Sequence, residues 1–293
     1  MSDDRIRPMR PEDVEAAERL SSEGFYEVDL RLTRRGDPDP QPRSAERSRQ
    51  WVDRTHHYLR TDPGGCWVAE IDGEPVGFAT SFNRELMWIL ATYVVKPGLQ
   101  GQGIGQVLLA AALHHGRGCL RGMLSASSDS RAIRRYRAAG FSLQPQMHLI
   151  GTVDRSVIPV VEKVRDGSAA DFELMDSIDR RIRGAAHGPD HAWLLSTFRL
   201  VVSDASTGSG YAFHAGDGTP MLLAATNRRT ATRLLWECLA ATDGQGFVPH
   251  VTAANEWAID VGLAARLDLQ PSGYLGLRNM RPPAPYLHHG SLL

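Results

Sequence analysis

The chain of 293 residues is long enough for two domains, and its 42% of hydrophobic residues suffices for packed cores. Its 33 Lys and Arg nearly balance its 34 Asp and Glu, so it lacks the basic excess that nucleic-acid-binding proteins carry. No run approaches the roughly 18 apolar residues of a membrane span, and the first residues lack the apolar core of a signal peptide. We therefore expect a soluble, cytoplasmic protein with no nucleic-acid or membrane partner.

The three cysteines, Cys66, Cys119 and Cys238, are odd in number and far apart. None lies in a CxxC pair or in a His/Cys spacing, so the sequence suggests neither a disulfide framework nor a zinc site. We expect reduced thiols and no metal.

The predicted elements begin with a short strand at 5–10, followed by a helix over 11–25 with Pro11 in its first turn and acidic residues near its start. A Gly-, Pro- and Asp-rich loop at 36–42 comes next. Ser44 then serves as the N-cap of a second amphipathic helix, whose apolar residues recur at helical spacing up to Leu59.

Residues 66–82 indicate a β-hairpin, because Asp72 and Gly73 separate two strand-like runs and large side chains alternate from Val76 to Phe82. Residues 86–95 form a nearly continuous apolar run, typical of a central strand covered on both faces. The remaining elements of this half are a glycine loop, a helix ending near Gly116, a strand at 122–128, a helix at 130–139 closed by Gly140, and a strand at 143–150.

The second half carries a faint copy of the first at an offset of 126 residues. The segment from Arg131 resembles the segment from Trp257, and Leu108, Leu109 and Leu113 correspond to Leu234, Leu235 and Leu239. Because one register without gaps relates these positions, we infer a duplicated unit. Two tandem domains are expected, with their boundary near 151–158.

Three glycines, Gly101, Gly103 and Gly105, stand between the apolar strand and a strong helix. A glycine inside a helix costs about 0.5 to 1 kcal/mol relative to alanine, so these positions need another reason. At a strand-to-helix turn the missing side chains let a ligand approach the backbone, and first-turn amides lack intrahelical partners, which makes an anion site. The spacing fits neither a Walker loop nor a GxGxxG fingerprint, since no Lys or hydroxyl follows Gly105 and Gln106 replaces the third glycine.

The stretch Gln100-Gly-Gln-Gly-Ile-Gly105 matches the Q/R-x-x-G-x-G/A pattern of the GNAT superfamily of N-acetyltransferases, and Val95-Lys-Pro97 matches the V-x-P that precedes it there. Residues 129–141 resemble that family's N-x-x-A-x-x-x-Y-x-x-x-G-F helix, with Asp129 where Asn is usual. The resemblance covers roughly residues 5–150, and the second half resembles the degenerate partner domain of tandem members.

This resemblance implies an α/β fold of two tandem domains, each with a mixed, mostly antiparallel twisted sheet flanked by helices. Residues 1–153 would form the catalytic domain. Residues 154–293 would form a degenerate domain that ends in a Pro-rich tail.

The resemblance also implies acetyl-CoA as the co-substrate and assigns roles along the loop. The backbone amides of Gly101, Gly103, Ile104 and Gly105 would hold its pyrophosphate, with Gln100, Gln102, Gln106 and Asp129 as further cofactor-binding residues. An ionised Asp can only accept hydrogen bonds, so the contact of Asp129 can be altered or lost.

Tyr93, Val94 and Val95 would lie beside the pantetheine arm, where a backbone N–H can stabilise the charge on the thioester oxygen. Tyr136 would donate a proton to the leaving thiolate, because a phenol of pKa near 10 is protonated at neutral pH whereas a thiol ionises near about 8.5.

The general base is less defined. An acceptor amine with a pKa of about 10.4 is almost wholly protonated at pH 7. Glu85, at the beginning of the apolar strand, is the nearest carboxylate and is a candidate base, since the strand interior has none. A water chain, an acceptor of low pKa, a residue of the second domain, and a relay through His56 or His57 stay open.

At the offset of 126, the second half lacks the functional residues: Gln100, Gly103, Gly105 and Tyr136 fall opposite Thr226, Arg229, Ala231 and Gly262. We therefore expect a second domain that does not bind acetyl-CoA in the same way. Its Pro-rich end is expected to pack back across the domain junction, towards the acceptor site.

The predicted function is N-acetyl transfer to a small-molecule or peptide amine, by direct transfer in a ternary complex, since no Cys or Ser nucleophile is indicated. The alternatives are a non-catalytic acetyl-CoA sensor or partner subunit, and transfer of a longer acyl group or transfer to an alcohol or thiol. A homodimer is left open.

Overall fold

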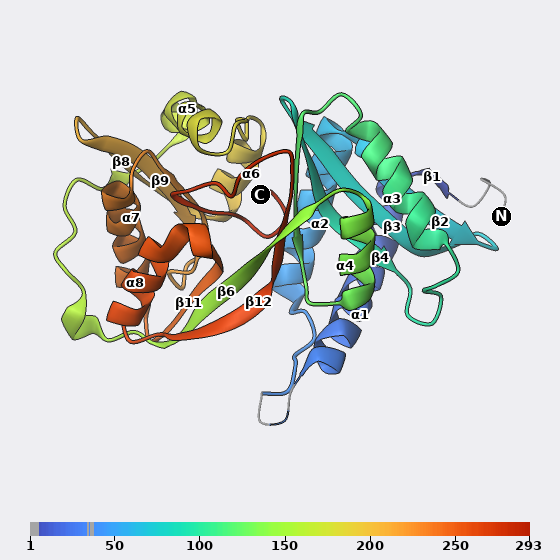
Figure 1. The fold of residues 1–293 in the computed structure, drawn as a ribbon, viewed down its shortest axis with the longest axis horizontal. Coiled ribbons are helices and arrows are strands. Elements are labelled where there is room, and N and C mark those ends of the chain that lie inside the picture. The colour runs from blue at the N-terminus through green and yellow to red at the C-terminus, as the bar shows by residue number, and fades with distance from the viewer. Residues whose placement is uncertain (1–5, 34, 36–37) are drawn as a thin grey trace. The chain divides into compact units, whose positions relative to one another are not determined.

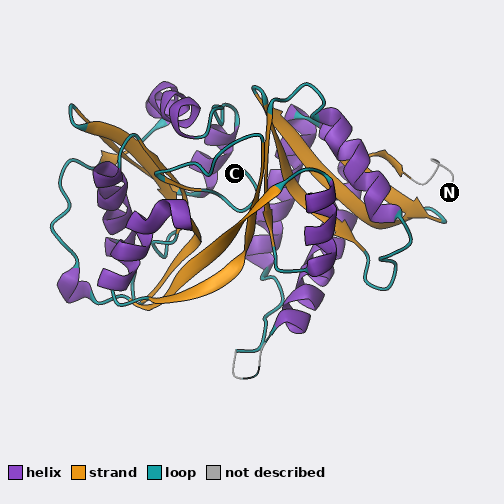
Figure 2. Ribbon diagram, in the orientation of Figure 1, coloured by secondary structure: helices purple, strands orange, loops and turns teal. Residues whose placement is uncertain are grey.

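The computed structural model describes residues 6–33, 35 and 38–293, which form two compact units (Figures 1 and 2). Unit 1 comprises Met1–Arg121 and Ser128–Ala139, and unit 2 comprises Gly122–Ser127 and Gly140–Leu293. Both combine antiparallel strand pairs with packed helices, which confirms the predicted α/β class. Residue 5 of the first predicted strand and residues 36 and 37 of the predicted loop lie outside the described residues.

Unit 1 contains the elements expected of the first half up to residue 139, except the strand predicted at 122–128, which belongs to unit 2. Its helices are α1 (Val14–Leu32), α2 (Ala45–Thr61), α3 (Ile104–His115) and α4 (Ser130–Ala138). Its strands β1 (Ile6–Pro8), β2 (Cys66–Ile71), β3 (Glu74–Arg84) and β4 (Met87–Val95) pair antiparallel in that order.

Local sequence signals set most of these boundaries. The Ser44 side chain accepts a hydrogen bond of 3.3 Å from the Arg47 amide and caps α2 as predicted. Asp72 and Gly73, at φ 53° and 81°, make the left-handed turn between β2 and β3. Helix α1 runs on to Leu32, beyond its predicted end, and passes through Gly24, whose backbone stays helical.

Helices cover both faces of the unit 1 sheet. On one face, Phe78 of β3 packs edge-on against Trp51 of α2, with ring centroids 5.7 Å apart. On the other face, the Gly77 backbone lies against Leu108 of α3. Residues 76–82 of β3 are therefore all buried. Large and small side chains alternate along β3 in the sequence, but buried and exposed positions do not.

Unit 2 contains four helices among its described residues: α5 (Phe172–Ile182), α6 (Asp190–Thr197), α7 (Arg228–Ala240) and α8 (Glu256–Ala264). One antiparallel set of strands has the order β5 (Arg121–Ala126), β12 (Asp268–Arg278), β6 (Ser142–Thr152) and β11 (Gln245–Thr252). A second sheet has the order β13 (Tyr286–Leu287), β10 (Pro220–Ala225), β9 (Gly208–His214), β8 (Arg199–Ala205) and β7 (Arg165–Asp166).

The last strands of the two sequence repeats are exchanged within unit 2. Strands β6 and β12 lie 126 residues apart in the sequence, as do α4 and α8, in agreement with the offset read from the sequence. Yet β5 pairs with β12, β11 pairs with β6, and β6 and β12 pair with each other (Figure 1). The strand expected to close the first domain therefore belongs to unit 2, and the compact units do not divide at residue 153.

The Pro-rich end is part of the core of unit 2. Strand β13 pairs with β10, and the side chains of Tyr286, Leu287, Leu292 and Leu293 are buried. This end therefore packs within unit 2, where Nε2 of His288 also lies 2.6 Å from Nε2 of Gln146 in β6.

Two composition-based expectations can be compared with the fold. Cys66, Cys119 and Cys238 are not joined in disulfides. Within the described part of the chain, each helix is too short or too polar to traverse a lipid bilayer.

Candidate active site

The predicted site residues of unit 1 gather where β4 ends and α3 begins. The Gln100 side chain braces the connecting loop: its Nε2 donates to the Val95 carbonyl oxygen at 3.1 Å, and its Oε1 accepts from the Gly98 amide at 3.0 Å. Gln100 therefore holds the loop onto the end of the strand, a role that the motif did not indicate.

The three loop glycines are needed for different structural reasons. Gly101 and Gly103 adopt left-handed φ angles of 88° and 87°, which glycine adopts without strain. A Cβ atom at Gly101 would meet no atom within 4 Å, so the backbone there faces open space. Gly105 lies inside α3, and a Cβ there would overlap the Tyr93 hydroxyl. Its missing side chain serves packing, while its amide stays a predicted ligand of the pyrophosphate.

The start of α3 is suited to an anion. Its N-cap is Gly103, and no side chain among the described residues caps it. The corresponding helix of the second repeat, α7, is capped by Asn227, whose Oδ1 accepts from the Thr230 amide at 2.9 Å. First-turn amides without a cap, together with the positive end of the helix dipole, favour a phosphate group. The open backbone at Gly101 fits such a ligand.

Two tyrosines lie beside this helix start. Tyr136 of α4 is 6% exposed, and its ring packs edge-on against Tyr93 of β4 with centroids 6.4 Å apart. Burial raises the pKa of Tyr93 to about 12 and raises that of Tyr136 above its ordinary value of 10. Both phenols are therefore protonated at neutral pH and can donate hydrogen bonds.

Asp129 already has protein partners. Its Oδ1 accepts from the Arg131 amide at 2.9 Å and caps α4, and its Oδ2 lies 2.9 Å from Nη2 of Arg31 on α1. The sequence predicted a cofactor contact for Asp129 and missed Arg31, which is 98 positions away. The cofactor contact stays a prediction.

Strand β4 contains a bulge that sequence periodicity did not reveal. Thr92 pairs with Thr80 and Leu90 with Ser81, so Ala91 is left without a partner in β3. A bulge bends a strand and takes one residue out of the hydrogen-bond ladder. It lies two residues before Tyr93, beside the predicted site of the pantetheine arm.

The structure does not bring Glu85 to these residues. Glu85 is exposed in the turn between β3 and β4, with a left-handed φ of 53°. The strand that separates it from Val95 has nine residues, a length of about 30 Å at roughly 3.3 Å per residue. His57, one of the two histidines left open as a proton relay, is buried on α2.

In the second repeat, protein groups occupy the corresponding positions. The Thr226 hydroxyl accepts from the Ser209 amide at 3.0 Å, and Gly262, the counterpart of Tyr136, packs against Leu149. The edge of β10 is taken by the Pro-rich end, whose Pro285 carbonyl accepts from the Ala225 amide at 3.3 Å. These contacts favour the prediction that the second repeat does not bind acetyl-CoA as the first would.

Comparisons with known proteins agree with this geometry. Residues 29–141 match the model of the acetyltransferase (GNAT) family. Mycothiol acetyltransferases of Thermomonospora curvata and Streptomyces avermitilis are each 36% identical to the chain, over 85 and 86 residues respectively. Each match covers 28% of this chain, and 29% and 28% of those two proteins. The matched segment thus spans less than a third of either relative.

Solved structures share the fold over almost the whole chain. A Pyrococcus horikoshii protein has a TM-score of 0.72 at 19% identity, covering 98% of this chain and 94% of its own. The GCN5-related N-acetyltransferase of Sphaerobacter thermophilus has a TM-score of 0.57 at 17% identity, covering 95% of this chain and 96% of its own. The solved structures show that the fold is shared, and the family model shows that the chain carries a domain of the acetyltransferase (GNAT) family over residues 29–141.

Proposed function

We propose that unit 1 transfers an acetyl group from acetyl-CoA to an amine, by direct transfer in a ternary complex. The observation that carries this proposal is the uncapped start of α3 with open backbone at Gly101, next to the protonated Tyr136. The family of residues 29–141 indicates acyl transfer, and the names of the two curated relatives support acetyl as the group transferred.

In this proposal the amides of Gly101, Gly103 and Ile104 bind the diphosphate, and residues 93–95 of β4 line the arm. Bound acetyl-CoA supplies an activated acyl carbon. Tyr136 holds its proton at Oη and donates it to the departing sulfur. Tyr93 packs between Gly105 and Tyr136, so it keeps the phenol of Tyr136 at a fixed place relative to α3.

We place the acceptor among small-molecule amines. Both curated relatives are named for mycothiol, a small molecule, and the near-neutral charge of this chain gives no sign of a polycationic acceptor. Assays of small amines against peptide amines, with acetyl-CoA in excess, test this choice. Turnover confined to peptides would contradict it.

The binding part of the proposal is tested by Gly101→Ala. The new Cβ would stand in the space that the ligand needs, so the affinity for acetyl-CoA should fall at least tenfold in calorimetry. Gly73→Ala is the matched control, because Gly73 has a similar φ of 81° and equally open surroundings in the β2–β3 turn. Equal affinities of wild type and both variants would refute binding at this loop.

The chemical part is tested by Tyr136→Phe. Loss of a general acid should lower kcat by about 10²- to 10⁴-fold, with the acetyl-CoA affinity kept. Tyr58→Phe is the control, since Tyr58 stacks on Phe82 at 5.0 Å, away from the loop. Unchanged turnover in Tyr136→Phe would remove Tyr136 as the donor, and binding without any turnover in wild type would favour the sensor alternative.

A further inference from the structure

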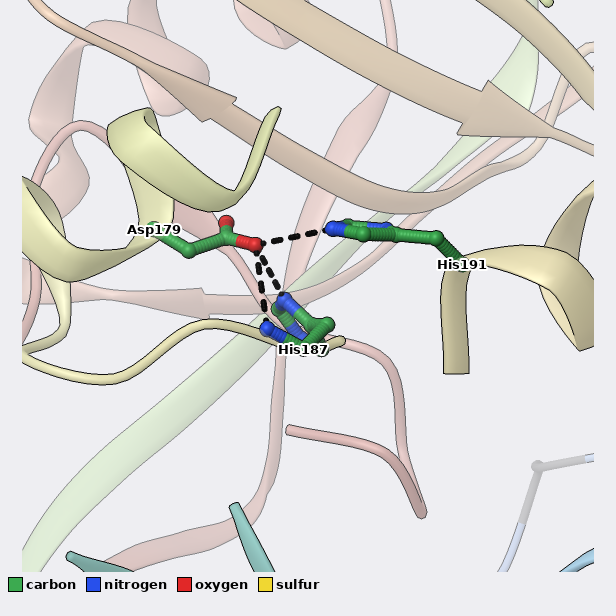
Figure 3. A group of neighbouring side chains, drawn as sticks. All are labelled: Asp179, His187 and His191. Carbon is green, nitrogen blue, oxygen red and sulfur yellow. Dashed lines mark hydrogen bonds and ion pairs between the residues drawn. The ribbon is translucent and has the colours of Figure 1, made fainter. Parts of the chain in front are cut away.

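Unit 2 buries a cluster of potential metal ligands that has no part in the proposed reaction (Figure 3). Asp179 lies on α5, His187 in the following loop and His191 on α6. One donor atom of each lies within 4.8 Å of the other two, and all three side chains are fully buried. Figure 3 shows a ring nitrogen of each histidine turned towards the same carboxylate oxygen.

The spacing of the donor atoms is close to that of a metal site. Asp179 Oδ2 lies 2.7 Å from His187 Nδ1 and 3.2 Å from His191 Nε2, and Asp176 Oδ1 lies 3.0 Å from that same Nε2. Zinc bonds of about 2.0 to 2.2 Å in a tetrahedron place the donors roughly 3.3 Å apart. The distance between Asp179 and His187 has to widen to admit the ion.

His191 turns Nε2 towards two carboxylates, at 3.0 Å from Asp176 and 3.2 Å from Asp179. Its other ring nitrogen, Nδ1, is buried without a hydrogen-bond partner among the described residues. A cation between the imidazole and Asp179 would be bound by Nε2 and the carboxylate together.

The surroundings orient the donors. The Tyr211 hydroxyl donates to Asp179 Oδ1 at 2.5 Å, so Oδ2 is left to face the histidines. The Tyr286 hydroxyl lies 3.3 Å from His187 Nε2, and the Gly188 amide donates to Asp176 Oδ1 at 3.0 Å. Outer hydrogen bonds of this kind fix the orientation of metal ligands in known sites.

Local charge also favours a divalent cation. Asp176, Asp179 and the buried Asp190 bring three carboxylates to this region, and Arg183 brings one guanidinium. The Arg183 side chain is directed to the backbone, since its Nε and Nη2 donate to the carbonyl oxygens of Ala185 and Ala186. Asp176 and Asp179 place two carboxylates against Nε2 of His191, and a divalent ion would balance their charge.

We propose that Asp179, His187 and His191 bind one Zn²⁺ ion. Two imidazoles and a carboxylate suit zinc, whereas calcium and magnesium prefer oxygen ligands alone. The three side chains are fully buried, so the role of the ion is structural: it fixes α5, the loop and α6 to one another. All three ligands lie within residues 179–191, a segment short enough to bind the ion as the chain folds. This proposal departs from the sequence-based expectation of no metal.

The first test measures metal content on the full-length chain without a histidine tag. After growth with added zinc and dialysis, elemental analysis should find about one zinc per chain. Asp179→Asn and His191→Gln should each lower this content at least tenfold. His250→Gln is the control, because His250 is a buried imidazole stacked on His288 outside the cluster. Wild-type zinc content in Asp179→Asn would overturn the proposal, since the metal would then lie elsewhere.

A second test needs no variant, in case the substitutions prevent folding. Wild-type protein stripped with a chelator should regain a higher melting midpoint when Zn²⁺ is added, because a ligand that binds only the folded state stabilises it. Co²⁺ added to the stripped protein should give the visible absorption bands of a tetrahedral site. An unchanged midpoint together with no such bands would overturn the proposal and leave a metal-free cluster.

Discussion

At the scale of single residues, the three loop glycines show that one motif can meet two unrelated constraints. Gly101 and Gly103 allow left-handed backbone, and the space beside Gly101 is open. Gly105 instead makes room for the hydroxyl of Tyr93. The spacing in the sequence could not separate these cases, because the neighbour that matters to Gly105 comes from another element.

Gly105→Ala should destabilise the protein although alanine is the better helix former. The added methyl group must displace the Tyr93 hydroxyl, and overpacking of this kind costs about 1 to 3 kcal/mol. The same change in a Tyr93→Phe background should recover most of that loss. Thermal unfolding of the two single variants and the double variant checks this. Additive losses would show that the hydroxyl is not the obstacle.

Turnover should not decrease through ionisation of Tyr136 below pH 10. Burial raises the pKa of this phenol above its ordinary value of 10, so the acid form persists throughout the usual assay range. On the basic side, kcat/KM should therefore rise with pH as the acceptor amine loses its proton, without a descending limb. A descending limb with a midpoint near pH 8, absent from Tyr136→Phe, would contradict this assignment.

Residue roles were predictable where they belong to a contiguous motif and were missed where they depend on distant partners. The loop glycines and Tyr136 stand out in the sequence. The ion pair of Asp129 with Arg31 does not, because α1 and α4 meet only in the folded unit. His187 and His191 are spaced as paired ligands often are, but Asp179 lies on another helix and the sequence does not show that it joins them.

At the scale of elements, helix caps and hydrophobic periodicity located the helices and strands of the first half. Ser44 begins α2 and Gly116 follows the end of α3, as their residue types indicate. The bulge at Ala91 was not predictable, because the apolar run continues through it without a break. The partner of β6 was not predictable either, since equivalent strands of a duplicated sequence can pair in more than one way.

The junction of α2, β3 and α3 should give unit 1 a measurable acid sensitivity. Burial alone would raise the pKa of Asp62, but hydrogen bonds from His115, the Asn83 amide and Arg84 outweigh it and lower this pKa to about 2. A carboxyl with a lowered pKa in the folded state stabilises above its unfolded value and loses that contribution as pH falls. The contribution of Asp62 should disappear between the ordinary value of 3.8 and about 2.

Urea unfolding at several pH values tests this with Asp62→Asn. The variant should be less stable near neutral pH by about 3 kcal/mol, because Arg84 loses its buried partner. Its stability should also fall less than that of the wild type in acid. Asp53→Asn, at an exposed position of α2, serves as the control. Parallel acid profiles of Asp62→Asn and wild type would disprove the role of Asp62.

At the scale of the whole molecule, two units were foreseeable from length and internal repetition. The residues that make up each unit were not foreseeable, because β6 pairs with strands of unit 2 and not with the half that precedes it in the sequence. The cytoplasmic location, the homodimer and the small-molecule acceptor stay predictions. Mass measurement in solution and fractionation of cells address the first two directly.

Removal of residues 286–293 should destabilise unit 2 strongly. These residues contribute strand β13 and four large buried apolar side chains, and full burial of each such side chain stabilises by about 1.5 to 3 kcal/mol. The shortened chain should unfold at a clearly lower temperature or aggregate. Val160→Ala, at a side chain that is 90% exposed, should leave the midpoint unchanged. A shortened chain with the wild-type unfolding curve would contradict this.

The alternating order of β5, β12, β6 and β11 has a consequence for any attempt to cut the protein in two. A nick in the exposed connection after Asp154 would separate the peptides but not the hydrogen-bonded ladders that hold them, since each peptide supplies every second strand. Either peptide made alone would lack the strands that pair with its own. Expressed together, they should recombine, so the chain is a ready starting point for a split reporter whose halves signal only when they meet.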